Sequence, residues 1–365
     1  MFPAGAGSLS ARLVQHLHGA IACAGGWLPF DRFMATALYE PGLGYYASGS
    51  RQFGTLPGSG SDFVTAPEMT PLFGQTLARQ LQQALDAAQS DQLFEFGAGS
   101  GALAEQLLDT LGRRVGCYSI VDLSGALRQR QAERLSRFAG RVRWLDAWPE
   151  QLCGVVIGNE LLDALPVQLL FWDGADWFER GVATDGAGLA WADRPTAHRP
   201  PHAGPFVPGT LTEIHPQAEA FVRTLADRLQ RGAAFFIDYG FPESEYYHPQ
   251  RTGGTLMCHQ AHRSDTNPLA DVGAKDITAH VNFSAIALVA QGAGLDVLGY
   301  TTQAHFLINC GLLDLLQDAD VRGKAAANKL IGEHEMGELF KVIAFGRGVQ
   351  IDPIGFARGD RSHTL

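Results

Sequence analysis

Three glycines at alternate positions form the strongest chemical signal in the chain. Gly97, Gly99 and Gly101 follow a short apolar run and precede an amphipathic stretch, which predicts a strand, a tight turn and a helix. Without a Cβ, the turn can bend sharply and let a ligand lie against the backbone. The spacing also fits the dinucleotide-binding pattern Gly-x-Gly-x-x-Gly/Ala. The glycines alone therefore leave the ligand open, and a turn without any ligand remains an alternative.

An acid beside the loop favours one class of cofactor. Glu95 stands two residues before Gly97. A carboxylate suits a ligand with an ammonium group, such as the methionine part of S-adenosylmethionine, and repels a pyrophosphate at short range. We therefore expect Glu95 and the three loop glycines to bind S-adenosylmethionine.

Two further acids follow the next two apolar runs. Asp122 lies 21 residues after Gly101, directly after a predicted strand, where a carboxylate accepts hydrogen bonds from both ribose hydroxyls. The alternative is that Asp122 caps the following helix. Asp146 follows the third predicted strand, where we expect the adenine amino group to be bound. The alternative there is a loop acid near Trp144 and Trp148.

The fourth predicted strand ends in a polar cluster that could bind both cofactor and substrate. Asn159, Glu160 and Asp163 follow it, and ligands bind at the carboxyl ends of strands in such sheets. We expect Asn159 to contact the cofactor, and Glu160 and Asp163 to bind a substrate amine or guanidinium. Asp238, at the end of the fifth strand, is a third candidate for the catalytic acids. Alternatively, the acids favour the start of a helix through its dipole.

Short apolar runs alternate with helical periodicity from residue 91 onwards, which predicts an α/β fold with a βαβ sheet. The seven predicted strands are Leu93–Phe96, Cys117–Val121, Val142–Leu145, Gly154–Gly158, Ala233–Asp238, Leu295–Tyr300 and Leu339–Phe345. The predicted helices of this region are Ala102–Leu111, Gly125–Arg137, Leu161–Leu170, Pro216–Arg231, His305–Asp318 and Val321–Gly332.

The predicted organisation is a helical N-terminal cap region (1–90), a Rossmann-like core (91–350) and a frayed tail (351–365). The cap region should hold the helices Ser10–Ala24, Phe30–Tyr39 and Pro71–Ala88, with a Gly/Ser/Pro-rich loop at 48–61. Two insertions interrupt the core. Asp-Gly turns predict antiparallel strands in 171–215, and 240–283 reads as a long functional loop. Its Tyr246 and Tyr247 either line a substrate cleft or pack the loop onto the core.

Composition excludes several classes of function. The formal net charge is −10 and no basic run is present, which argues against nucleic-acid binding. The chain has no stretch of about 20 apolar residues and no signal-peptide pattern, so we expect no membrane span and a cytoplasmic location. The five cysteines are scattered, as in a reducing compartment. Cys258, His259 and His262 lack a fourth ligand, so we expect no metal.

The assembled motifs resemble those of the MidA-type family of methyltransferases over about residues 30–345. The resemblance is carried by YEPGLGYY from Tyr39, SDFVTAPE from Ser61 with LFG from Leu72, the loop from Glu95 to Gly101, GNELLDALPV from Gly158, IDYG from Ile237 and GAKDITAHVNF from Gly273. The chain departs from the family with Asp122 in place of the usual Glu, and with Ser61 in place of Gly.

The resemblance implies a seven-stranded class I methyltransferase sheet with cofactor bound at Glu95, Gly97, Gly99, Gly101 and Asp122. Mitochondrial members of the family methylate protein arginines and assist assembly of respiratory complex I. We therefore expect methyl transfer to a protein arginine, with a protein substrate as partner, no nucleic acid and no membrane, and a homodimer left open. Two alternatives remain: an assembly factor that binds the cofactor without catalysis, and a nicotinamide-dependent oxidoreductase. The chain lacks the Tyr-x-x-x-Lys motif and the second nucleotide motif that would indicate such an oxidoreductase.

Overall fold

The computed structural model describes residues 6–48, 65–122, 124–186, 188–261 and 263–365. The chain divides into two compact units. The core unit comprises Val64–Leu162, Ala220–Pro242 and Phe283–Leu365, and the accessory unit comprises Met1–Phe63, Asp163–Glu219 and Glu243–Asn282. The segment 1–90 is thus shared between the units, and the accessory unit contains all of the predicted insertion 171–215 and most of 240–283. The predicted loop 48–61 and the start of the SDFVTAPE motif lie outside the described residues, apart from Ser48.

All seven predicted strands are present in the core unit, which confirms the α/β class. They are β2 (Gln92–Phe96), β3 (Cys117–Val121), β4 (Val142–Leu145), β5 (Leu152–Asn159), β10 (Leu229–Phe241), β15 (Asp296–Thr302) and β16 (Phe340–Arg347). Their order in the sheet is β15-β16-β10-β5-β2-β3-β4. The strands from β10 to β4 run parallel, and β16 runs antiparallel to both of its neighbours. The carboxyl ends of β2, β3, β4 and β5 therefore lie at one edge of the sheet.

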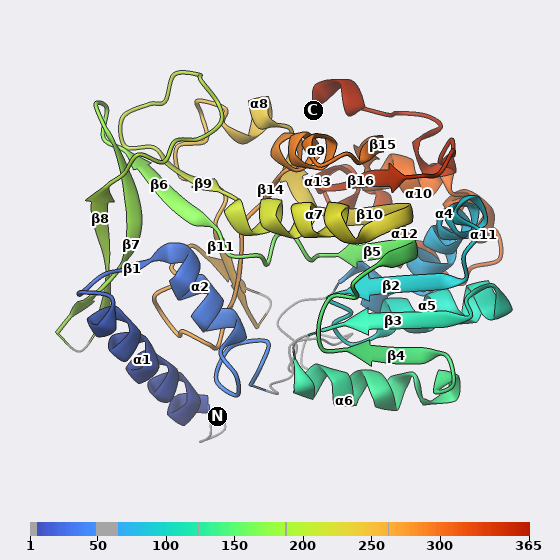
Figure 1. The fold of residues 1–365 in the computed structure, drawn as a ribbon, viewed down its shortest axis with the longest axis horizontal. Helices are drawn as coiled ribbons and strands as arrows, with labels where there is room; N and C mark the ends of the chain where they lie inside the picture. Colours follow the sequence, from blue (N-terminus) through green and yellow to red (C-terminus); the bar gives the residue numbers. More distant parts are fainter. Residues whose placement is uncertain (1–5, 49–64, 123, 187, 262) are drawn as a thin grey trace. The chain divides into compact units, whose positions relative to one another are not determined.

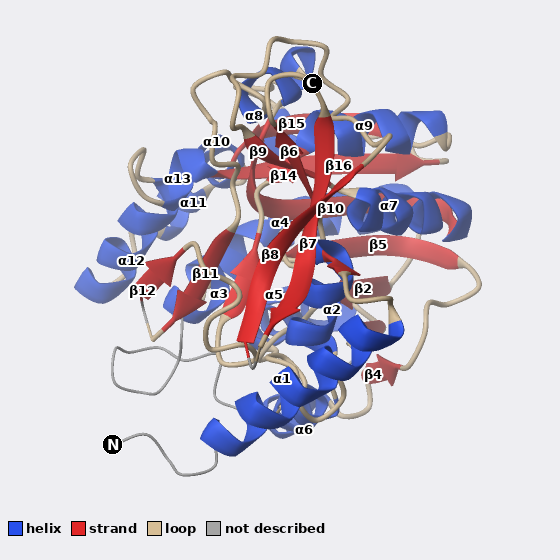
Figure 2. Ribbon diagram, turned by 90° about the vertical axis from the view of Figure 1, so that its left-hand side faces the viewer, coloured by secondary structure: helices blue, strands red, loops and turns tan. Residues whose placement is uncertain are grey.

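Helices cover both faces of this sheet. They are α3 (Ala66–Met69), α4 (Leu72–Ala88), α5 (Ala102–Leu111), α6 (Gly125–Arg134), α7 (Pro216–Arg228), α9 (Phe283–Gly292), α10 (Gln303–Asn309), α11 (Leu312–Leu315), α12 (Val321–Ile331) and α13 (Met336–Leu339). α4 and α5 lie on one face, and α7 and α9 on the other (Figures 1 and 2). Leu77, Leu103 and Val155 belong to the buried cluster between α4, α5 and the sheet. Burial of each such side chain contributes about 1.5–3 kcal/mol.

The accessory unit joins the N-terminal helices to the two insertions. Its helices are α1 (Ala6–Cys23), α2 (Phe30–Tyr39) and α8 (Glu243–Tyr246). One antiparallel sheet contains β1 (Leu28–Pro29), β6 (Gln168–Trp172), β7 (Trp177–Asp185), β8 (Gly188–Pro195) and β9 (Leu211–Ile214). The predicted antiparallel strands in 171–215 are thereby confirmed. Phe33, Leu169 and Ile277 share the buried core of this unit.

Three expectations about local structure were wrong, and the first two concern the segment 240–283 and the C-terminal tail. The segment 240–283 is more than a loop, because it holds α8 and a small sheet of β11 (Met257–Gln260), β12 (Arg263–Asp265) and β13 (Asp276–Thr278). The tail is docked rather than frayed: Phe356 is buried, and the backbone N–H of Arg361 donates to Tyr300 O at 2.6 Å. The crossover helix α9 was not predicted.

The third correction concerns the predicted helix Leu161–Leu170, which does not form. The chain makes a turn after β5 and then enters β6. Glu160 has a φ of 51°, which is a left-handed conformation that no helix tolerates. Pro166 would lack the N–H that a helix needs at that position.

Candidate functional site

The glycine loop has the backbone conformation that its sequence predicted. Gly97, Gly99 and Gly101 have φ values of 69°, 53° and 80°, all in the region that L side chains avoid. Gly97 N–H donates to Val121 O at 3.2 Å, which ties the loop to the end of β3. α5 begins directly after Gly101.

Glu95 is a buried residue of β2, and its side chain is not exposed at the edge where the strand ends. Its side chain is 2 % exposed and accepts a hydrogen bond of 2.7 Å from the phenol of Tyr118. Burial raises the pKa of Glu95 to about 7, although the Tyr118 hydrogen bond opposes the rise. A contact between this acid and the cofactor ammonium stays a prediction.

Asp122 is held in place from two sides at the end of β3. Its Oδ1 accepts from the backbone N–H of Ser124 at 2.9 Å, and its Oδ2 accepts from Gln131 Nε2 at 2.9 Å. A carboxylate has about four acceptor positions, so both oxygens keep capacity for ribose hydroxyls. The capping alternative was wrong, because the N-cap of α6 is Ser124, whose hydroxyl accepts from Leu127 N–H.

Arg128 joins the ends of β3 and β4. Its guanidinium donates to the carbonyls of Asp122 and Leu145 and forms an ion pair with Asp146. The Asp146 side chain is otherwise 91 % exposed. The structure thus places Asp146 at the same edge as Asp122, and its role toward adenine stays a prediction.

The polar turn after β5 is shaped by Asp238. Its buried Oδ2 accepts the backbone N–H groups of Leu161 at 3.0 Å and Leu162 at 2.7 Å, and its Oδ1 accepts from Tyr239 N–H at 3.2 Å. These contacts stabilise the turn that replaces the predicted helix. Asp238 therefore has a clear structural task, which its sequence position did not show.

The turn presents Glu160 beside Asn159. Asn159 Nδ2 donates to Glu160 Oε1 at 3.1 Å, and Glu160 N–H donates to Ile237 O at 2.9 Å. The Glu160 side chain is partly exposed. Asp163 belongs to the accessory unit, where it is buried and its carbonyl accepts from Ala279 N–H at 3.0 Å.

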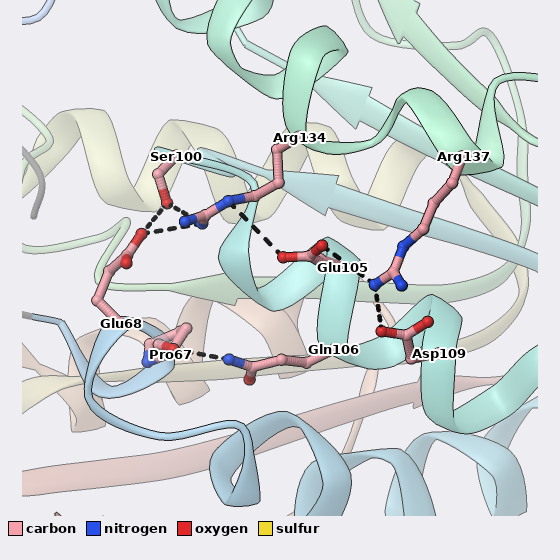
Figure 3. A network of polar contacts seen from close by, with 8 residues as sticks. All are labelled: Pro67, Glu68, Ser100, Glu105, Gln106, Asp109, Arg134 and Arg137. Atoms are coloured by element: carbon pink, nitrogen blue, oxygen red, sulfur yellow. Dashed lines mark hydrogen bonds and ion pairs between the residues drawn. The ribbon is translucent and has the colours of Figure 1, made fainter. Parts of the chain in front are cut away.

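A polar network that the motifs did not reveal braces the glycine loop (Figure 3). Glu68, on α3, accepts hydrogen bonds from Ser100 of the loop and from Arg134 at the end of α6, the latter at 3.0 Å. Arg134 also donates to the Ser100 hydroxyl at 2.8 Å. Gln106 of α5 donates to Pro67 O at 2.6 Å. Glu68, the last residue of the SDFVTAPE motif, thus holds the glycine loop.

Two further predictions concerned residues of the accessory unit. Tyr246 and Tyr247 are 1 % and 3 % exposed and both donate to Glu213, through its carboxylate and its carbonyl respectively. They pack the segment, as the second alternative held. Across the described residues, no group of three His, Cys, Asp or Glu side chains is arranged to bind a metal, and His262 lies outside them. No helix in the described ranges is long and apolar enough to cross a bilayer.

Comparison with known proteins agrees with this architecture. Residues 75–301 match the family described as "Putative S-adenosyl-L-methionine-dependent methyltransferase". The mitochondrial protein arginine methyltransferase NDUFAF7 of Danio rerio is 27 % identical, covering 92 % of this chain and 86 % of that protein. Its Xenopus tropicalis counterpart is 28 % identical, covering 90 % and 84 %.

A solved structure is similar over the whole chain. A Burkholderia thailandensis protein, crystallised with S-adenosyl-homocysteine, is 52 % identical, with a TM-score of 0.96, covering 100 % of this chain and 99 % of that one. A native structure from the same organism is 50 % identical with a TM-score of 0.92 and the same coverage. The chain belongs to this family of S-adenosylmethionine-dependent methyltransferases.

Proposed function

We propose that this methyltransferase transfers the methyl group of S-adenosylmethionine to an arginine side chain of a protein. The substrate class is that of the relatives named protein arginine methyltransferase. The observation that carries the proposal is the pair Asn159 and Glu160 at the carboxyl end of β5, a partly exposed carboxylate oriented by a neighbouring amide.

The residues at this edge of the sheet fit the cofactor. Asp122 offers ionisable oxygens with acceptor capacity for two ribose hydroxyls, and the left-handed glycine loop removes side chains where a ligand would approach. We propose that Asp146 contacts the adenine and that Asn159 contacts the cofactor. S-adenosylmethionine supplies an already activated sulfonium methyl group, so the protein must mainly align the acceptor and exclude water.

Glu160 would bind the acceptor guanidinium and take up its proton. A guanidinium has a pKa above about 12, so its nitrogen needs a carboxylate that orients it and accepts a proton as the new N–C bond forms. Asn159 holds Glu160 through its side-chain amide. Asp163 remains the candidate second acid. For Asp238 we propose a positioning role in the turn, because three backbone N–H groups already occupy its oxygens.

The test is single-turnover methylation with labelled S-adenosylmethionine. The acceptor is a protein extract from cells lacking the gene, in which the native target is unmethylated. Labelled methylarginine after acid hydrolysis supports the proposal. Cofactor binding without any transferred label would instead support the non-catalytic assembly factor, and label on another amino acid would contradict arginine as the acceptor.

Two finer statements stay predictions. The link to respiratory-complex assembly rests on the family resemblance. The cytoplasmic location rests on the five free cysteines, whereas the curated relatives are named as mitochondrial proteins.

A further inference from the structure

A buried amide lies behind the cofactor site and joins its separate parts. Gln131 on α6 is 0 % exposed. Its Nε2 donates to Gly99 O and to Asp122 Oδ2, both at 2.9 Å, and its Oε1 accepts from Trp144 Nε1 at 2.9 Å. One side chain thus connects the loop after β2, the end of β3 and a residue of β4.

The contacts use both donors of this amide and one of its two acceptor positions. A glutamine amide has two N–H donors and a carbonyl oxygen with two lone pairs, and here two acceptors lie at its nitrogen and one donor at its oxygen. The Trp144 indole can only donate, so it fixes which end of the amide faces Asp122. The amide is therefore held in a single orientation, with both hydrogens directed at the cofactor-binding elements.

The same contacts control the charge and position of Asp122. Burial raises the pKa of Asp122, and the hydrogen bonds from Ser124 and Gln131 lower it. Gln131 therefore favours the ionised carboxylate, which is the form with most acceptor capacity for ribose hydroxyls. Gln131 also packs closely against the glycine loop, since a Cβ on Gly101 would lie 3.4 Å from Gln131 Cγ.

We propose that Gln131 is a positioning residue for the cofactor, which holds the Asp122 carboxylate and the glycine loop in one fixed arrangement. It does not touch the cofactor itself and acts through its two acceptors. The inference rests on cofactor binding by the family and is independent of which substrate is methylated.

The experiment compares two buried glutamines by calorimetric titration with S-adenosyl-homocysteine. Gln131→Met removes both donors at similar volume. Gln80→Met is the matched control, since Gln80 is also 0 % exposed in the core unit and hydrogen-bonds Gln83 and Gly355, in α4 and the tail. Titrations are made at a temperature at which circular dichroism shows each variant folded.

Both variants should lower the melting temperature, but Gln131→Met should also weaken binding by about 10-fold or more, the effect of a hydrogen bond to a charged group. Gln80→Met should bind within twofold of wild type. A second comparison uses Asp122→Ala with and without Gln131→Met. Because Gln131 acts largely through Asp122, the double variant should bind better than the product of the single losses predicts.

Binding by Gln131→Met within twofold of wild type would overturn the inference, as would losses from Gln131→Met and Asp122→Ala that multiply independently. If Gln131→Met does not fold, Trp144→Phe removes the bond that orients the amide while Gln131 itself stays in place, and an unchanged affinity in that variant would overturn the inference equally. A wild-type protein that binds no S-adenosyl-homocysteine would contradict the proposed function as well as this inference. A protein that binds it equally well with and without Gln131→Met would contradict this inference alone.

Discussion

The phenol of Tyr118 donates a 2.7 Å hydrogen bond to Glu95, so the acid that precedes the glycine loop is held inside the sheet. Both residues are almost fully buried, and the pair links β2 to β3. Burial is the main reason that the pKa of Glu95 rises from 4.5 to about 7.

This pair predicts a specific dependence of stability on pH. The pKa of Glu95 is higher in the folded than in the unfolded protein, so proton binding by Glu95 stabilises the fold. This stabilisation is complete below about pH 4.5 and is lost as the pH rises through about 7. Glu95→Gln should therefore be more stable than wild type at pH 8, by at most about 3 kcal/mol, with the difference shrinking toward pH 5. Urea unfolding at both values measures it, and a difference that grows toward pH 5 would contradict the raised pKa.

Gly99→Val should abolish binding of S-adenosyl-homocysteine while the protein stays folded. The φ of 53° at Gly99 strains a β-branched residue, and its methyl groups would occupy the ligand side of the loop. The wild type should bind in the micromolar range, about −8 kcal/mol. Gly140→Val, two residues before β4, serves as control, because a Cβ there meets no atom within 4 Å. Equal affinity of Gly99→Val and wild type would remove the loop from the site.

Asp122→Ala should weaken cofactor binding by about 1.5–3 kcal/mol, the contribution of hydrogen bonds to a charged group. The helix after it keeps its cap, because Ser124 performs that function, but the buried Gln131 amide loses an acceptor, so the melting temperature should fall as well. Titration calorimetry gives the affinity. A large loss of stability with a loss of affinity under about 0.5 kcal/mol would assign Asp122 a purely structural role.

The network around Glu68 should contribute measurably to stability (Figure 3). The Glu68 side chain is 6 % exposed where it meets Arg134, so Glu68→Gln should cost about 1–2 kcal/mol. The exposed pair of Arg137 and Asp109 offers a control, and Asp109→Asn should cost less than about 0.5 kcal/mol. Equal free energies of unfolding for the two variants would show that burial adds nothing to the Glu68 contacts.

Much of the fold could be predicted because its central strands are buried on both faces. Such strands give continuous apolar runs, and the bounds predicted for β3 match the structure. The helix after β5 was predicted wrongly because periodicity outweighed Pro166, although a proline at that position argues against a helix. The Asp238 contacts that stabilise the turn come from 76 or 77 residues further along the chain, which local patterns cannot show.

The candidate site was predictable where a motif determines backbone shape and hidden where side chains meet across elements. The glycine loop carries its conformation in its own residues. Gln131 carries a fainter signal, since it lies four residues after the buried Leu127 of α6 and four residues before the buried Leu135 at the C-cap of this helix. A polar residue at such a position calls for a buried partner, but the partners Gly99, Asp122 and Trp144 are known only from the fold.

The most direct test of the proposed role of Glu160 is the rate of methyl transfer by the variant Glu160→Gln. This change keeps the volume and removes the charge and basicity of the residue that we propose to bind the guanidinium. Single-turnover transfer to arginine should fall at least about 100-fold, the low end for a general base. The affinity for S-adenosyl-homocysteine should stay within twofold, because Asp122 and the glycine loop bind the cofactor. Methyl transfer at the wild-type rate, measured on a preparation with unchanged cofactor affinity, would contradict the account.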